Sequence, residues 1–245
     1  MENRRGCKGC WHAAMRTQKR WGTCMQKSQV IAGLLAAFGL LAPGAAHAQS
    51  ALGPYVSLGL GLDKMPDRML TINGRAGVTS QWKPGWGGLA AIGYKWFFGL
   101  RTEAEYSGRV SWVRTFNNDA PWAGTAWDNS VMVNGLYDFE FDSPVTPFVG
   151  GGIGLNQIQW GNNFRASTQA PPPTIYDGES IRPGWQGIAG LSYAVSPQIA
   201  VAVDGRIKGS FGHFNFTGSV PGKSINQFDY ETRSVFVSVR YSFGG

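Results

Sequence analysis

All the charged side chains of residues 100–112 fall at odd-numbered positions. Arg101, Glu103, Glu105 and Arg109 share one parity, whereas bulky apolar residues such as Tyr106 occupy the other. A helix would spread both sets around its circumference, but a strand turns successive side chains to opposite faces. The spacing therefore predicts a two-faced strand of about a dozen residues. Soluble strands usually have about 5–6 residues, and about 9–11 tilted strand residues cross a bilayer.

Nucleophilic catalysis would need a His beside a Ser, positioned by a carboxylate. Beyond residue 48 the sequence keeps one histidine, His213, and Ser210 lies three positions before it. Residues three apart on a strand point to opposite faces, so we expect His213 to be an ordinary loop histidine. Metal-ligand clusters and phosphate-binding loops are not evident, because the glycines of residues 150–154 fit a strand. We therefore predict no enzymatic activity and no cofactor.

About eight segments alternate in the manner of residues 100–112. Long polar connections between them take turns with short ones, which is typical of an up-and-down barrel. The predicted fold class is all-β: an eight-stranded antiparallel transmembrane β-barrel with short periplasmic turns and four longer extracellular loops. The glycines of residues 147–159 leave the facing of that strand open. The predicted strands are residues 52–62, 86–98, 100–112, 127–139, 147–159, 184–195, 198–211 and 229–243.

Aromatic residues near the ends of these segments provide an independent indication. A ring with an apolar body and a polar edge suits the membrane–water interface, so a membrane barrel carries two aromatic girdles. Tryptophans gather at the strand ends that adjoin the long connections, and tyrosines predominate at the opposite ends. The predicted girdle residues are Trp86, Trp112, Trp127, Trp160, Trp185, Trp96, Tyr137, Tyr193 and Tyr241.

Alternation alone does not show which parity faces outward, because a soluble lipocalin-type barrel keeps its apolar parity inside. The apolar parity here is nearly free of charge along each strand, as lipid contact requires. We therefore expect the charged parity to line the lumen. At about eight strands side chains just fill a lumen, which favours an ion-paired plug over the alternative of a narrow ion pathway. The predicted interior residues are Lys95, Arg101, Glu103, Glu105, Arg109, Asp128, Asp138, Asp204, Arg206, Lys208 and Arg240.

Residues 1–48 have the features of a presequence, and residues 49–245 form the predicted barrel domain. An apolar run at residues 30–41 is too short to span a membrane and precedes Ala46 and Ala48, which form a small-x-small cleavage site. Met25 is a second candidate start. Residues 1–48 account for +6 of the formal charge of +7, so the exported part lacks the basic character of a nucleic-acid-binding protein. All three cysteines also precede residue 49, which excludes a disulfide framework in the barrel.

Two stretches carry a resemblance to a known family. Residues 146–156 (TPFVGGGIGLN) and residues 237–243 (VSVRYSF) resemble the small porin-like outer-membrane proteins and surface antigens of Gram-negative bacteria, which are similar to the membrane half of OmpA-type proteins. The resemblance implies a location in the cell outer membrane and a barrel fold. It also implies that Tyr241 and Phe243 serve as an assembly signal for the outer-membrane barrel assembly machinery. It implies no particular activity.

We expect a structural role at the cell envelope, with the outer loops exposed as an antigen or adhesion surface. The alternative is a narrow, low-conductance porin-like channel, and a lipid A-modifying enzyme is a third hypothesis. The expected partners are membrane lipids and lipopolysaccharide, the assembly machinery, and a host or surface ligand bound by the loops. We expect no nucleic acid partner.

Overall fold

The computed structural model describes residues 51–72, 75–116, 122–165, 175–218, 224–228 and 230–243. All of them belong to one compact unit, Ala46–Gly245. The predicted presequence, including Met25, Ala46 and Ala48, lies outside the described residues. In the described part of the chain, no helix is long and apolar enough to cross a membrane.

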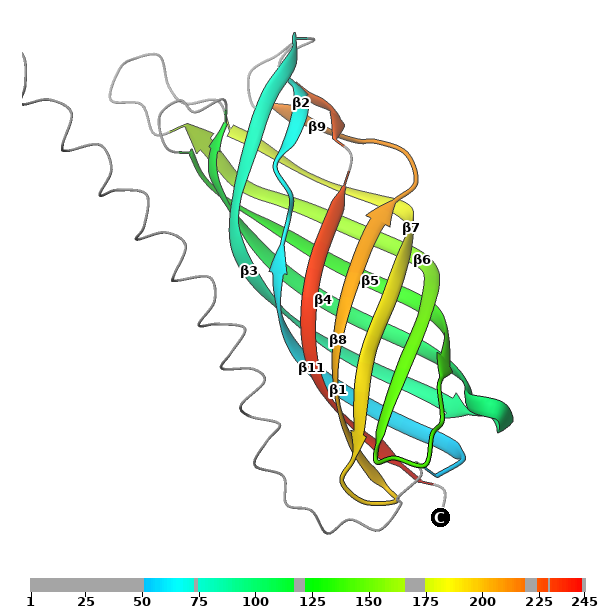
Figure 1. The fold of residues 1–245 in the computed structure, drawn as a ribbon. Coiled ribbons are helices and arrows are strands. Elements are labelled where there is room, and N and C mark those ends of the chain that lie inside the picture. Colours follow the sequence, from blue (N-terminus) through cyan, green and yellow to red (C-terminus); the bar gives the residue numbers. More distant parts are fainter. Residues whose placement is uncertain are drawn as a thin grey trace, which may run out of the picture. The chain divides into compact units, whose positions relative to one another are not determined.

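Eight long antiparallel strands, counted over the described residues, close into a barrel (Figure 1). They are β1 (Gly53–Lys64), β3 (Arg75–Lys95), β4 (Leu100–Phe116), β5 (Trp122–Asp138), β6 (Val145–Arg165), β7 (Ile175–Ala194), β8 (Ile199–Ser210) and β11 (Glu231–Ser242). Three short strands are added at one end: β2 (Arg68–Ile72), β9 (Phe214–Gly218) and β10 (Ser224–Phe228). The predicted fold class is confirmed.

The first and last long strands close the barrel. Leu58 on β1 lies opposite Ala90 on β3 and also opposite Val239 on β11, so β1 is paired along both sides. The short strands repeat this pattern beyond β1, because β2 pairs with β3 and β10, and β9 pairs with β10 and β7. Closure leaves no long strand edge unpaired within the described wall, and a bilayer core tolerates no open edge.

The two ends of the barrel differ. We call one the turn end, where η1 (Phe97–Gly99) joins β3 to β4 and where β11 finishes. The backbone there is tight: Gly99 has a φ of +77°, and a Cβ at Gly99 would lie 2.3 Å from the carbonyl oxygen of Asp138. At the other end, the loop end, β2, β9 and β10 lengthen the wall (Figure 1).

The strands are longer than the sequence predicts at the loop end. The stretches that the sequence leaves as long loops are largely strand in their described parts. They are residues 63–85, 113–126, 160–182 and 212–228. Gly, Pro and Asn made these stretches look like loops, but ladder hydrogen bonds to neighbouring strands compensate for their weak strand preference. Pro84, for example, lies at a register shift between Lys83 and Trp86, where a bulge removes the need for its missing N–H.

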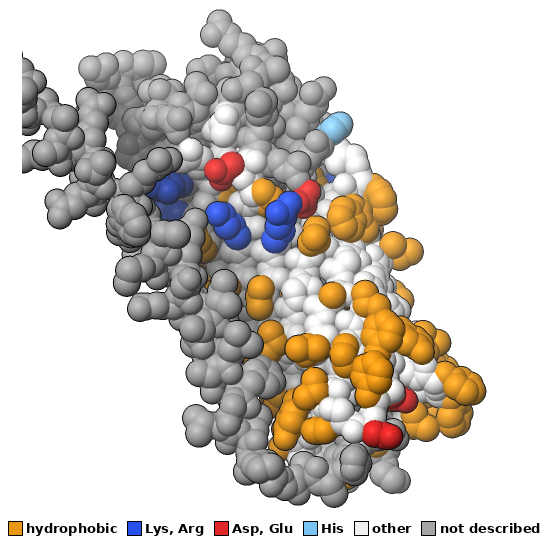
Figure 2. Space-filling view, viewed as in Figure 1, with side chains coloured by type: hydrophobic (Ala, Val, Ile, Leu, Met, Phe, Trp, Pro, Cys, Tyr) orange, Lys and Arg blue, Asp and Glu red, His pale blue; other side chains and the backbone are white. Residues whose placement is uncertain are grey.

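Side chains alternate as the sequence predicts, with the apolar parity outside. The side chains of Leu58 and Leu60 are 66% and 70% exposed, whereas Ser57, which precedes Leu58 on β1, is buried. The facing of β6 is now assigned, because Asn156 is buried and Leu155 is exposed. Figure 2 shows the resulting apolar zone over the wall of the barrel. The lipocalin-type alternative, with apolar residues inside, is therefore wrong.

Candidate functional site

The barrel interior is the richest concentration of polar chemistry in the described residues. Six cations and six carboxylates are buried there, and the charges balance. The structure places all eleven predicted interior charges in this set, and it adds Asp63 at the loop end of β1. The charges form three clusters, one above another along the lumen. Because a buried charge without a partner costs several kcal/mol, the pairing within each cluster decides whether the interior is stable.

The middle cluster is centred on Glu105 of β4. Its carboxylate accepts a hydrogen bond from Arg206 Nη1 at 2.6 Å and another from Asn134 Nδ2 at 3.0 Å. Arg206 also donates from Nε to Asp204 Oδ2 at 2.5 Å. Gln186 Nε2 donates to Asn134 Oδ1 at 2.7 Å, which completes a connected network across the lumen from β4 to β8. Such a network holds opposite walls of the barrel together.

The cluster at the loop end joins two aspartates to two cations. Arg109 lies 3.3 Å from Asp128 Oδ2 through Nη1 and 3.5 Å from Asp63 Oδ1 through Nε. Lys208 also pairs with Asp128. Tyr230 donates its hydroxyl to Asp128 Oδ2 at 2.5 Å, so this carboxylate accepts from three sides. A residue between β10 and β11 is thereby tied to the loop-end cluster inside the barrel.

The cluster at the turn end is built around Arg101. Its Nε lies 2.9 Å from Asp138 Oδ1, and its Nη1 lies 3.0 Å from Glu103 Oε1. Tyr55 donates its hydroxyl to the same Glu103 oxygen at 2.6 Å. Lys95 bridges Asp138 at 3.7 Å and leads out to Glu140 at 2.7 Å.

Aromatic rings fill much of the space that the ion pairs leave. Arg109 and Arg206 stack over Phe236 from two levels, with their Cζ atoms 5.4 and 5.2 Å from the ring centre. Arg240, near the turn end, lies 5.5 Å from the Tyr55 ring. A cation over an aromatic face is attracted by the ring quadrupole. The hollow between the turn-end and middle clusters has a volume of only about 20 Å³, close to the size of one water molecule.

Several of these partners were missed by sequence analysis. Tyr55 and Asp63 have the parity of Ser57, so the alternation of residues 52–62 could have placed Tyr55 inside, and Asp63 as well had that strand been extended by one residue. Asn134 likewise lies on the inward parity of β5. Tyr230 and Thr232, which donates its hydroxyl to Asp63, fall within the predicted strand of residues 229–243 and share the parity of Arg240, so the alternation could have placed them inside as well.

The described residues contain no group of three or more His, Cys, Asp and Glu side chains that could hold a metal ion. His213 lies between β8 and β9 and is exposed, while Ser210 is half-buried at the end of β8. Within the described interior, the charged side chains are joined by ion pairs and hydrogen bonds.

Most predicted girdle residues lie on the outer face. Trp86, Trp112 and Trp127 are exposed near the loop end. Trp160 is different, and its assignment to the girdle is wrong. It is only 2% exposed and packs edge-on against the equally buried Trp82, with ring centres 5.5 Å apart. The cause is the unresolved facing of β6, since Trp160 has the inward parity of Asn156.

The remaining girdle residues face outward, exposed or half-buried, nearer the turn end or on β7: Trp96, Tyr137, Trp185, Tyr193 and Tyr241. Tyr241 and Phe243, the predicted assembly signal, are both exposed, and their rings meet edge-on at 5.2 Å. Phe243 also donates its backbone N–H to the Pro54 carbonyl, which fixes the end of β11 against β1.

Comparison with known proteins gives a consistent result. The profile of the family described as "Outer membrane protein beta-barrel domain" matches residues 32–243. An outer membrane protein of Gluconacetobacter diazotrophicus is 32% identical over 239 residues, which cover 82% of this chain. This chain spans 60% of the length of that relative.

Two solved structures show the same fold at low sequence identity. Neisserial surface protein A (NspA) is 19% identical with a TM-score of 0.52, covering 80% of this chain and 100% of that one. OprG of Pseudomonas aeruginosa is 12% identical with a TM-score of 0.54, covering 79% of this chain and 98% of that one. At these identities the likeness concerns the fold alone.

Proposed function

Because this chain belongs to the outer membrane protein beta-barrel domain family, we propose that it serves as a closed structural barrel of the outer membrane and presents its loop end at the cell surface. The location follows from the family, and the confirmed fold supplies the barrel. The structural role, the closed lumen and the surface role as an antigen or adhesion site are our proposal.

The observation that carries a closed lumen is the charge balance of the interior. Three clusters of ion pairs cross the lumen at successive levels, and the cation–π contacts of Arg109 and Arg206 with Phe236 fill the space between two of them. A conducting pore needs a continuous aqueous path, whereas the hollow next to the middle cluster holds about 20 Å³. An interior of this kind supports a plug that makes the barrel rigid.

A narrow ion pathway is the second candidate, and one observation favours it. Some buried polar atoms along the described lumen have no hydrogen-bond partner, among them Arg109 Nη2, Asp128 Oδ1 and Gln186 Oε1. Such atoms attract water. A chain of waters past these groups would let small ions leak through the barrel.

An enzymatic role has less support. The third hypothesis needs His213 to act with a hydroxyl and a carboxylate at the outer rim. His213 is exposed on the chain between β8 and β9, and Ser210, three positions before it, is half-buried at the end of β8. We propose that the protein does not modify lipid A. Replacing His213 with Ala should leave the acyl chains of lipid A unchanged in cells that produce the variant.

Conductance across a planar bilayer tests the closed lumen. We expect a flat trace from the folded parent protein at moderate voltage. The double variant Glu105→Ala/Arg206→Ala removes the middle cluster and should admit small ions, which shows that the preparation inserts and that the assay detects an opened lumen. Folding of both proteins is checked by their altered gel migration before boiling. Discrete conductance steps from the parent would overturn the plug and support the ion pathway.

A further inference from the structure

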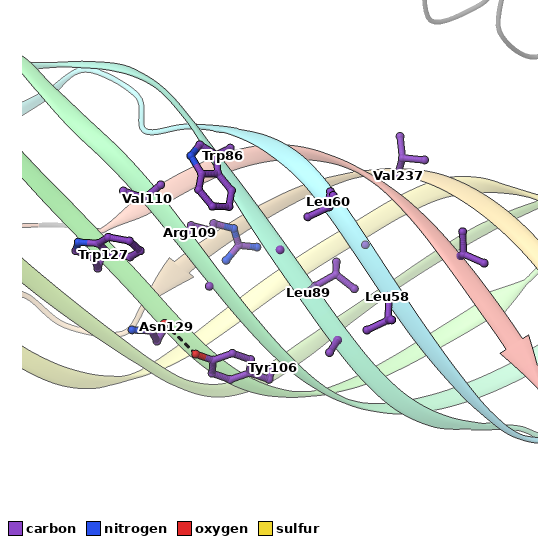
Figure 3. Close-up of a pocket in the computed structure, with 15 residues that line it drawn as sticks. Leu58, Leu60, Trp86, Leu89, Tyr106, Arg109, Val110, Trp127, Asn129 and Val237 are labelled. Carbon is purple, nitrogen blue, oxygen red and sulfur yellow. Dashed lines mark hydrogen bonds between the residues drawn. The ribbon is translucent and has the colours of Figure 1, made fainter.

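An apolar groove runs along the outer wall of the barrel, over β1, β3 and β4. Its volume is about 960 Å³. Small residues form its floor, since Gly88 and Gly108 present no side chain between Leu60 on one side and Tyr106 on the other. Figure 3 shows Trp86, Trp127 and Tyr106 along one margin and Leu58, Leu60 and Val237 along the opposite one.

Two polar side chains of this wall are hydrogen-bonded to each other. Tyr106 donates its hydroxyl to Asn129 Oδ1 at 3.0 Å, as the dashed line in Figure 3 marks. A second hollow of about 440 Å³ shares Leu58, Ala90 and Tyr106 with the groove and continues it towards the turn end. The shape is a long apolar channel open to the bilayer, which suits an extended hydrocarbon chain.

Four cations lie on the same outer wall, closer to the loop end. Lys64, Lys83, Arg114 and Arg233 are all exposed. Each is three or four positions beyond a groove residue of its own strand, a distance of about 10–13 Å at about 3.3 Å per residue. Figure 2 shows Lys and Arg side chains in a row along the border of the apolar zone, with acidic side chains beside them. With the loop end facing outward, as proposed above, this border lies at the level of the headgroups in the outer leaflet.

These cations differ from those in the lumen. Lys64 lies directly opposite Arg233 in the β1–β11 ladder, and like charges in that position destabilise a sheet. Arg233 reaches Glu231 at 3.3 Å. Within the described part of the chain, Lys64, Lys83 and Arg114 form no ion pair with an acid. The net positive charge of the row is therefore available for an anion from outside the protein.

From the groove and the cation row together, we infer that this wall binds lipid A of the outer leaflet. One acyl chain lies in the groove, and the anionic groups of the headgroup contact Lys64, Lys83, Arg114 and Arg233. Several negative charges joined to several acyl chains match both features at once. The inference rests on the outer-membrane location and is independent of whether the lumen conducts.

A second copy of the chain fits the same wall less well. A two-fold axis along the membrane normal would place the same patch of both copies in contact. The cation row of one copy would then face the identical row of the other. Charge complementarity thus favours an anionic amphiphile over a dimer.

Native mass spectrometry of the folded full chain tests the site by titration with three lipids: bisphosphorylated lipid A, dephosphorylated lipid A and phosphatidylglycerol. We expect one tightly bound bisphosphorylated lipid A per barrel. The variant Lys64→Gln/Lys83→Gln/Arg114→Gln should lose affinity for it by about tenfold or more, while Lys64→Arg keeps parental affinity. Gly88→Leu should weaken the binding of both forms of lipid A. A Cβ at this position has room, and the longer leucine side chain would fill the groove.

Gly187→Leu is the matched control for the groove. Gly187 lies on β7, away from the groove, and a Cβ there would meet nothing within 4 Å. It should bind lipid A as the parent does. Equal affinity of the parent for lipid A and phosphatidylglycerol would overturn the inference, as would parental affinity in the triple Gln variant. A dimer whose assembly Gly88→Leu abolishes would assign the groove to a second copy instead.

Discussion

At the scale of single residues, parity determines which charges are buried, and distance across the lumen determines how they pair. The alternation of residues 100–112 was enough to place Arg101, Glu105 and Arg109 inside. It could not predict that Glu105 meets Arg206, because those two residues come from β4 and β8 and their contact depends on the closed barrel. The sequence therefore predicts which charged residues line the interior, but not which of them pair with each other.

Glu105 should be the most sensitive residue of the interior. Replacing it with Ala leaves Arg206 with one carboxylate fewer and removes the acceptor of Asn134 Nδ2. Breaking a buried ion pair by deleting one partner costs about 3–5 kcal/mol. We expect a loss of that order in the free energy of unfolding, measured by urea titration in lipid vesicles with the gel shift of the folded form as the readout.

An exposed glutamate on another strand serves as the control. Glu179 on β7 accepts a hydrogen bond from Gln159 at the outer surface. Surface replacements usually change stability by less than about 0.5 kcal/mol, so Glu179→Ala should have a urea unfolding midpoint close to that of the parent protein. Similar urea midpoints for the two Ala variants would show that the middle cluster contributes no stability.

At the scale of strands, the sequence predicts existence and facing better than length. Residues 127–139 correspond closely to the described core of β5, because their alternation is strict. β6 could not be oriented from sequence, since Gly150, Gly152 and Gly154 share the inward parity and carry no side chain to mark it. The consequence was the wrong placement of Trp160. The same glycines have a steric role that the sequence did not reveal, because it depends on the neighbouring strand.

Gly152 should tolerate no side chain. A Cβ there would lie 2.0 Å from Asn134 Oδ1 and 2.7 Å from the Val133 carbonyl oxygen. Gly152→Ala would displace Asn134 from the middle cluster, and overpacking of this kind costs about 1–3 kcal/mol. We expect a lower urea midpoint in the same unfolding assay.

Gly135, on the neighbouring strand β5, provides the comparison. A Cβ there would meet nothing within 4 Å. Gly135→Ala should match the stability of the parent or slightly exceed it, because alanine leaves the unfolded chain fewer backbone conformations than glycine does. A stable Gly152→Ala variant beside an equally stable Gly135→Ala variant would show that β6 does not need its inward glycines.

At the scale of the whole molecule, the sequence predicts a closed barrel because eight two-faced strands in a membrane must leave no edge. It does not predict β2, β9 and β10, which lie in the stretches 63–85 and 212–228 that the sequence analysis leaves as loops. β2 pairs locally with β3, but the pairing of β2 with β10 and of β9 with β7 joins residues far apart in the sequence. Fold and location were thus accessible from local patterns, while the height of the wall required the assembled sheet.

Closure itself can be tested with a disulfide across the seam between β1 and β11. Leu58 and Val239 lie directly opposite each other and both point outward. Residues in this position have Cβ atoms about 4.5–5.5 Å apart, close enough for a disulfide after small adjustment. All native cysteines precede residue 25, so after removal of the presequence Leu58→Cys/Val239→Cys carries only the designed pair. We expect oxidation of outer-membrane fractions to cross-link it nearly completely.

The pair Leu58→Cys/Val235→Cys separates register from mere proximity. Val235 lies opposite Leu62, four residues along the strand from the partner of Leu58, which is about 13 Å at about 3.3 Å per residue. It should stay reduced under the same conditions. An open sheet would bring neither pair together, and a slipped seam would cross-link the second pair instead of the first. Because one closed register can give only the first result, the ratio of the two yields directly reports closure of the barrel.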